Sequence, residues 1–254
     1  LEHGTVYLTI PYEPLSSVDS PERKYRYNKY SRVVDNENIV NGIAYITTNL
    51  RVIFENDWMD DLQYLSEPTK YHEKRITAKF ICSRSIAQEI TRHRVFSFLM
   101  ESQRYVAYNR DKFGGEITII IPEWIKARIN DIASYDRNDD LAQMPYAEAL
   151  MDERTEDDKS IKIWLTSQIT SEYLYKQLTD ELEVKAEEAR SVLTNDCKTE
   201  LVMTGFVSDW NHFFDLRSRG TTGKPHPDIK ILADNLLFQF INNNIIDENQ
   251  TNGV

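Results

Sequence analysis

Apolar residues recur along most of this chain with the spacing of helices. Between residues 35 and 65, two apolar stripes with helical spacing follow one another. The first stripe contains Ile39, Ile43, Ala44 and Ile46, and the second contains Val52, Phe54, Trp58, Leu62 and Leu65. This spacing predicts two consecutive helices near the N-terminus.

The pattern changes to alternation from Arg75 to Cys82, which is typical of a strand. Ser83 or Ser85 then stands where a serine hydroxyl can accept a hydrogen bond from the first free amides of a helix. We therefore predict a strand followed by a helix that runs to about Arg94.

The next segment mixes short runs of both kinds. We predict a loop over 95–100 and a short strand over 101–108. Gly114 and Gly115 then turn the chain. A β-branched run over 116–121 predicts another strand, because it stops at a proline.

From residue 123 onward the pattern is mostly helical. Helices are predicted over 124–134, 146–153, 159–183, 184–193, 207–216 and 228–242, with one strand over 199–204. The sequence shows no internal repeat. The sum predicts a helix-rich α+β fold with a small, mostly antiparallel central sheet. We expect one domain over 1–254, with 1–34 and 243–254 peripheral or frayed.

Composition narrows the class of protein. The 254 residues are 41% hydrophobic and 28% charged, which is typical of globular proteins. The net charge of −11 disfavours nucleic acid as a partner, because such binding depends on neutralising many phosphates. The sequence contains neither a membrane-length apolar run nor a secretory signal, and its two cysteines fit a reduced, cytoplasmic environment.

The densest chemical cluster is Arg92-His93-Arg94, followed by Ser102 and Arg104. Arginine forks bind phosphate oxygens through two hydrogen bonds, and a serine hydroxyl adds a further donor. Basic residues are also common at helix C-termini, where the helix dipole favours them. On composition alone that structural interpretation is the stronger one. As a covalent nucleophile Ser102 is disfavoured, because no general base accompanies it.

The spacing of the cluster changes this estimate. Arg-His-Arg, seven residues, Ser, one residue and Arg-Tyr resembles the signature of the flavin-dependent thymidylate synthases, here at residues 92–105. Two further segments, 189–193 and 210–217, resemble the second and third arginine segments of that family. The resemblance covers about Tyr71 to Arg217.

The resemblance implies roles for individual residues. It implies that the uracil ring pairs with Arg217, which would be the catalytic residue because a fixed cation stabilises the ring's anionic form. Flavin contacts are implied for Arg92, His93, Arg94, Phe206 and His212. Nucleotide contacts are implied for Glu89, Arg92, Glu101, Ser102, Gln103, Arg104, Arg190 and Arg217.

Three positions depart from the family pattern. Leu99 and Met100 stand where many members have polar residues, and Phe206 replaces an amide by a ring. No metal site is expected, since His72 and His226 lack a second ligand at helical spacing.

The resemblance implies reductive methylation of deoxyuridylate (dUMP) to thymidylate. Methylenetetrahydrofolate would donate the carbon, FAD the hydride, and NADPH would restore reduced FAD. It also implies a homotetramer with shared active sites. Two alternatives stay open, namely a non-catalytic nucleotide- or flavin-binding relative and an unrelated helical interaction protein whose arginines are surface charges.

Overall fold

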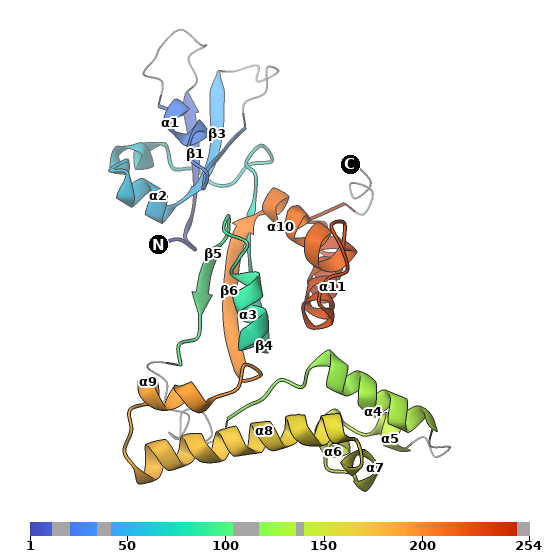
Figure 1. The fold of residues 1–254 in the computed structure, drawn as a ribbon. Coiled ribbons are helices and arrows are strands. Elements are labelled where there is room, and N and C mark those ends of the chain that lie inside the picture. Colours follow the sequence, from blue (N-terminus) through green and yellow to red (C-terminus); the bar gives the residue numbers. More distant parts are fainter. Residues whose placement is uncertain (12–20, 35–41, 104–116, 136–139, 248–254) are drawn as a thin grey trace.

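A computed structural model describes residues 1–11, 21–34, 42–103, 117–135 and 140–247. Two small sheets and a set of helices form three tiers along the long axis of the molecule (Figure 1). The N-terminal sheet lies at one end, the central sheet lies in the middle, and a helical arm lies at the other end. The expected α+β class is confirmed, but with two sheets in place of one.

The N-terminal sheet has the strand order β1-β3-β2, and all neighbours are antiparallel. Its strands are β1 (Thr5–Pro11), β2 (Arg32–Val34) and β3 (Ile43–Asn49), and its helices are α1 (Arg23–Arg26), α2 (Leu50–Glu55) and the 3₁₀ helix η1 (Met59–Tyr64). Val6, Leu8 and Ile10 of β1 are buried in a core with Ile46. Residues 5–11 are thus a packed strand inside the stretch expected to be peripheral.

The predicted helix over the first apolar stripe is wrong, because Ile43 to Asn49 form β3 in the middle of this sheet. Burial alternates from Ile43 to Ile46, as in a strand with one covered face, and becomes continuous toward the end of β3, where α2 begins. Four consecutive residues from Ile46 to Asn49 are buried accordingly. The second stripe forms α2 and η1, so the helical prediction holds there.

The central sheet has the order β4-β6-β5, again antiparallel throughout. Its strands are β4 (Arg75–Ser83), β5 (Ser97–Met100) and β6 (Lys198–Phe206). Three helices contribute to its core, namely α3 (Arg84–Ile90), α10 (Val207–Phe214) and α11 (Pro227–Asn242). The π-helical turn η5 (Asp215–Arg219) continues α10. Three aromatic side chains of α10, Trp210, Phe213 and Phe214, are fully buried in this core.

The predictions for this segment hold in part. The strand at 75–82, its serine cap and the strand at 199–204 are confirmed. The helix ends at Ile90, before Arg94, and the predicted loop contains β5. The predicted strand at 101–108 is absent over the described residues 101–103, and 104–108 lie outside the described part. Of the strand predicted at 116–121, the described residues form a single bridge, from Ile119 to Cys197.

The helical arm follows β5 and leads back into β6. It contains α4 (Glu123–Tyr135), α5 (Asp140–Gln143), α6 (Tyr146–Ala149), α7 (Glu153–Glu156), α8 (Lys159–Lys176), the π turn η3 (Gln177–Glu181), α9 (Ala186–Ala189) and the 3₁₀ turn η4 (Arg190–Val192). The helix predicted over 159–183 therefore ends in the π turn η3. The helix predicted over 184–193 is split into α9 and η4, and the one predicted over 146–153 is split between α6 and the beginning of α7. Among the described helices, none combines the length and apolarity needed to span a bilayer.

Candidate active site

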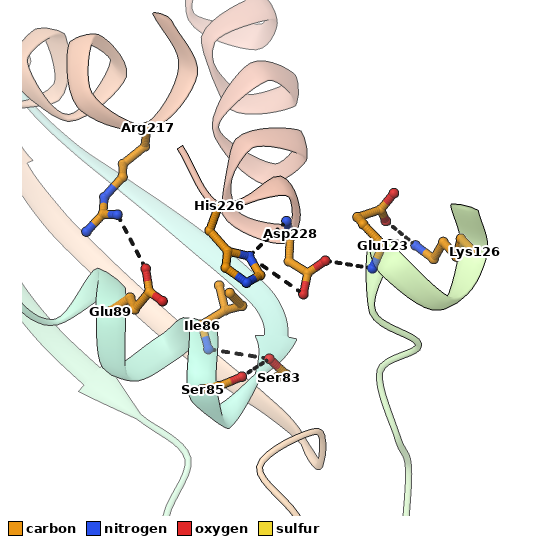
Figure 2. A network of polar contacts seen from close by, with 9 residues as sticks. All are labelled: Ser83, Ser85, Ile86, Glu89, Glu123, Lys126, Arg217, His226 and Asp228. Atoms are coloured by element: carbon orange, nitrogen blue, oxygen red, sulfur yellow. Dashed lines mark hydrogen bonds and ion pairs between the residues drawn. The ribbon is translucent and has the colours of Figure 1, made fainter. Parts of the chain in front are cut away.

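Helix α3 presents one polar face because its other face is buried. The Ser83 hydroxyl caps the helix by accepting from the Ile86 amide at 3.4 Å. Ile86, Ala87 and Ile90 are buried in the central core. Glu89 consequently points away from the sheet, toward the turn that follows α10 (Figure 2).

That turn carries Arg217. Burial of Phe213 and Phe214 fixes α10 against the sheet, and the π turn then ends at Gly220, whose φ of 70° suits glycine. The Arg217 side chain is 23% exposed, so it is partly withdrawn from water but reachable by a ligand.

Arg217 is held by two acceptors from the α3 segment. Its Nε donates to Nε2 of His93 at 3.1 Å, and its Nη1 donates to Oε2 of Glu89 at 3.3 Å (Figure 2 shows the Glu89 contact). The structure thus brings together three of the residues singled out in the sequence, 128 positions apart at their widest. With two nitrogens occupied, the third guanidinium nitrogen makes no hydrogen bond within the described part of the chain.

His93 serves this contact as a neutral acceptor. Its burial, followed by the charges of Arg217 and His212, lowers its pKa from 6.5 to about 4. Because Nε2 accepts from Arg217, the ring proton of the neutral imidazole resides on Nδ1. Phe213 meets the His93 ring edge-on with centroids 5.0 Å apart, which limits the ring's rotation.

Two further guanidiniums flank this contact. Arg92 and Arg94 follow the last turn of α3 and are both exposed. A helix C-terminus carries partial negative charge, so an anion binds there only if nearby positive side chains exceed that charge. Arg217 pairs with Glu89, and Arg92 and Arg94 stand on either side of His93 in the sequence; guanidinium donors of this kind fit the phosphate oxygens of a nucleotide or flavin.

The remaining predicted residues divide between the two ends of β6. Glu101, Ser102 and Gln103 follow β5, next to the beginning of β6, where the Glu101 amide donates to the Glu200 carbonyl at 2.8 Å. Arg190 is exposed beside α9, at that same end, and its Nε donates to the Glu187 carbonyl. In Figure 1, α9 and α10 lie at opposite ends of β6.

Within one chain, therefore, the predicted arginines do not all converge. Strand β6 spans nine residues, or roughly 25–30 Å of strand, and Arg190 lies before its beginning whereas Arg217 lies beyond its end. The residue types and their order along the chain carried no information on this separation. Arg104 lies outside the described residues.

Phe206 and His212 differ in their access to a ligand. The Phe206 ring is 2% exposed and lies under the guanidiniums of Arg32, at 4.4 Å, and Arg75, at 5.7 Å. This placement gives no support to a flavin contact by Phe206. His212 is exposed on α10.

Sequence reasoning missed Arg75, an arginine that contacts the signature segment from below the surface. The Ser97 hydroxyl, part of the signature segment, accepts from the Arg75 guanidinium and donates to the Glu2 carbonyl, both at 3.3 Å. Burial lowers the pKa of Arg75 to about 10. No local pattern marks such a residue, because Arg75 sits in an ordinary alternating strand.

The histidines considered as metal ligands have other partners. His72 accepts from the Thr69 amide at 3.0 Å through Nδ1, and its Nε2 donates to the Leu8 carbonyl. His226 caps α11 by accepting from the Asp228 amide, and Asp228 in turn accepts from the Glu123 amide at the beginning of α4 (Figure 2). Among the described residues, no group of three or more potential ligands could hold a metal ion.

A comparison with known families covers the segments around α3 and α10. Residues 68–242 match the family model described as thymidylate synthase complementing protein. The match covers more than half of the chain. The chain belongs to this family.

Members of the thymidylate synthase complementing family with curated names are similar to this chain at low identity. A flavin-dependent thymidylate synthase of Mycolicibacterium gilvum is 30% identical over 59% of this chain and 49% of its own length. One from Corynebacterium efficiens is 28% identical over 59% of this chain and 50% of its own length. A probable flavin-dependent thymidylate synthase of Paramecium bursaria Chlorella virus 1 is 29% identical, over 61% of this chain and 62% of its own length.

The chain thus spans about half the length of the curated relatives it matches. The family match includes both the α3 segment and Arg217, whereas β1, β2 and β3 lie before it. The family match therefore does not include the N-terminal sheet.

Proposed function

We propose that the chain catalyses the reductive methylation of dUMP to thymidylate. We also propose that it has the fold of the flavin-dependent thymidylate synthases and acts in the cytoplasm. The observation that carries the proposal is the Arg217 guanidinium, held by His93 and Glu89 beside two exposed arginines. Methylenetetrahydrofolate would supply the carbon and NADPH the reducing equivalents. The family match and the names of its relatives support this choice.

Arg217 has the properties that uracil methylation requires. Attack from C5 of uracil needs electron density on the ring, which a fixed cation beside the ring carbonyl and N3 stabilises as it develops. Guanidinium stays protonated at every working pH, so this cation does not titrate away. The His93 and Glu89 contacts hold it in one orientation before substrate arrives.

The exposed arginines fit the phosphates of the flavin. Arg92 and Arg94 offer fork-shaped donors at the α3 C-terminus, where an anion needs cations to bind. His93 and His212 lie beside them for ring contacts. When bound, FAD supplies the hydride chemistry that no side chain provides.

The separation of the predicted residues supports a shared site. Glu101, Ser102, Gln103 and Arg190 lie at one end of β6, and Arg217 lies at the other. A nucleotide is much shorter than this separation, so both groups can touch it only if they come from different protomers. We infer that Arg104 joins the first group, and that Glu89 and Arg92 face the nucleotide beside Arg217.

Helix α8 supports a homotetramer. Ile163, Ile169 and Tyr173 along it are 72%, 56% and 58% exposed. Monomeric proteins rarely leave many large apolar side chains of one helix open to water, and such exposed groups mark association surfaces. We propose that α8 packs against another protomer.

Two measurements test the proposal. A yellow preparation with a flavin absorption band is expected, and dUMP labelled with tritium at C5 should release it only when methylenetetrahydrofolate is present. Flavin binding without tritium release would instead favour the non-catalytic relative, for which exposed Leu99 and the apolar Met100 would be the reason. A preparation that binds neither FAD nor dUMP would refute both.

The Arg217→Ala variant tests the catalytic assignment. Removing one preorganised cation from a developing anion costs on the order of 100- to 1000-fold in kcat. FAD should stay bound, because Arg92 and Arg94 are untouched. Arg128→Ala is the matched control, since Arg128 pairs with Asp158 on the helical arm. Full activity of Arg217→Ala would remove this residue from the mechanism.

A further inference from the structure

The N-terminal sheet repeats the topology of the central sheet. In both, the third strand lies between the first two, all pairings are antiparallel, and a helix connects the first strand to the second. The middle strand then runs directly into a helix, β3 into α2 and β6 into α10. The two units share no visible sequence repeat, so the likeness is one of three-dimensional structure alone.

This repetition defines a position in the N-terminal unit that corresponds to the candidate active site. In the central unit, the site lies where the segment after α3 meets the helix that follows the middle strand. The counterpart is where the segment after α1 meets α2. A cleft of about 330 Å³ lies there.

The cleft combines polar walls with an aromatic floor. Asn28 and Tyr30 come from the segment after α1, Asn49 and Asn56 come from the two ends of α2, and Phe96 and Ser97 come from the signature segment. Its volume is at the lower end of the range for small-ligand pockets, which is about 300–1000 Å³. It is large enough for a fused heterocycle.

Asn49 is the feature that points to a ligand. Its side-chain oxygen caps α2 by accepting from the Val52 amide at 2.9 Å, which fixes the orientation of the amide group. Asn49 is 3% exposed, yet its Nδ2 makes no hydrogen bond to any described residue. Nδ2 opens onto the cleft, where the acceptor atom of a ligand can replace water as its hydrogen-bond partner.

The charges around the cleft cancel. Arg51 pairs with Glu2 and with Glu55, the latter through its Nε at 2.6 Å, and Lys29 lies 4.8 Å over the Tyr30 ring. The Asn28 oxygen accepts from the Tyr30 amide at 2.9 Å, so its amide nitrogen is the group left for a ligand. Amide donors together with Phe96 and Tyr30 suit a neutral, planar ring with acceptor atoms.

We propose that this cleft binds a neutral fused heterocycle of the purine or pterin type. A ring nitrogen or carbonyl accepts from Nδ2 of Asn49, and the ring packs near Phe96 and Tyr30. The Phe96 ring also lies 6.5 Å from His93, between centroids, so the bound ring is separated from the candidate active site by one side chain. The proposal does not depend on methyl transfer at Arg217.

Equilibrium dialysis of the full chain against adenosine and against pterin tests this assignment. At least one ring should bind at concentrations up to about 5 mM, in the affinity range of small fragments. The Asn49→Asp variant should bind at least about tenfold more weakly, since an acceptor then faces an acceptor. Aspartate caps a helix as well as asparagine does, so the thermal midpoint should not change. Tyr30→Ala provides a second variant if Asn49→Asp fails to fold.

Two control variants show whether the ring binds in this cleft. Asn243→Asp makes the same chemical change on an exposed residue of the C-terminal segment and should leave binding unchanged. Arg217→Ala should leave it unchanged as well, whatever it does to thymidylate synthesis. Binding of adenosine alone assigns a nucleotide-type ligand, and binding of pterin alone assigns a folate-type ligand. The proposal is overturned if neither ring binds. It is also overturned if Asn49→Asp and Tyr30→Ala both bind as tightly as the unmodified chain.

Discussion

Gly205 sits on β6 directly against the ring of Phe96, the residue between the candidate active site and the cleft. A Cβ at this glycine would lie 2.3 Å from two carbons of the ring, about 1 Å closer than ordinary contact. The Phe96 ring is 5% exposed and packs edge-on against Trp210 with centroids 4.8 Å apart. It therefore has little room to withdraw.

Two opposing effects decide the result of Gly205→Ala. Alanine in a strand loses less backbone entropy on folding than glycine, which favours the variant by about 0.5–1 kcal/mol. Forcing an extra methyl group into a well-packed core costs about 1–3 kcal/mol, and an overlap of about 1 Å with a buried ring belongs at the upper end. We expect the free energy of unfolding to fall by about 2–2.5 kcal/mol.

Urea unfolding followed by tryptophan fluorescence measures this difference. Gly4→Ala is the control, since its Cβ would meet only the flexible end of the partly exposed Leu50, and its effect should stay within about 0.5 kcal/mol. Phe96→Leu in the same chain should make Gly205→Ala less costly by at least about 0.5 kcal/mol. The ring must move aside if Gly205→Ala is as stable as the unmodified chain. The same conclusion follows if the effects of Gly205→Ala and Phe96→Leu on stability are strictly additive.

Three further outcomes are expected. Folding lowers the pKa of His93 from 6.5 to about 4, so the unfolded chain takes up the proton at higher pH than the folded chain. The free energy of unfolding should therefore decline as the pH falls from 6.5 to about 4. In urea titrations, His93→Gln should flatten this decline. Arg32→Leu leaves the Asp209 carboxylate, now 2.9 Å from the guanidinium, without this partner and should lower the free energy of unfolding by about 2 kcal/mol; an unchanged melting curve would show that the ion pair does not stabilise the fold. Ile163→Glu should yield smaller assemblies in light scattering, and Lys159→Glu, at the beginning of the same helix, should not.

Much of the local structure followed from the sequence. Alternation over Arg75 to Cys82 and the serine after it predicted β4 and its cap, because strand period and capping depend on neighbouring residues alone. The arginine segments predicted an anion site, which stays a prediction; the structure adds that Arg217 contacts His93 and Glu89.

The rest depended on contacts between distant segments. Ile43 to Asn49 have apolar residues that also fit a helix, and pairing with β1 and β2 on both sides decided for a strand. Arg190 and Arg217 are separated because they lie beyond opposite ends of β6, and Asn49 lines a cleft because three segments meet around it. A linear pattern encodes the period of each element, whereas the pairing of elements depends on side chains far apart along the chain. Only the tertiary structure could therefore show that the chain uses one sheet topology twice.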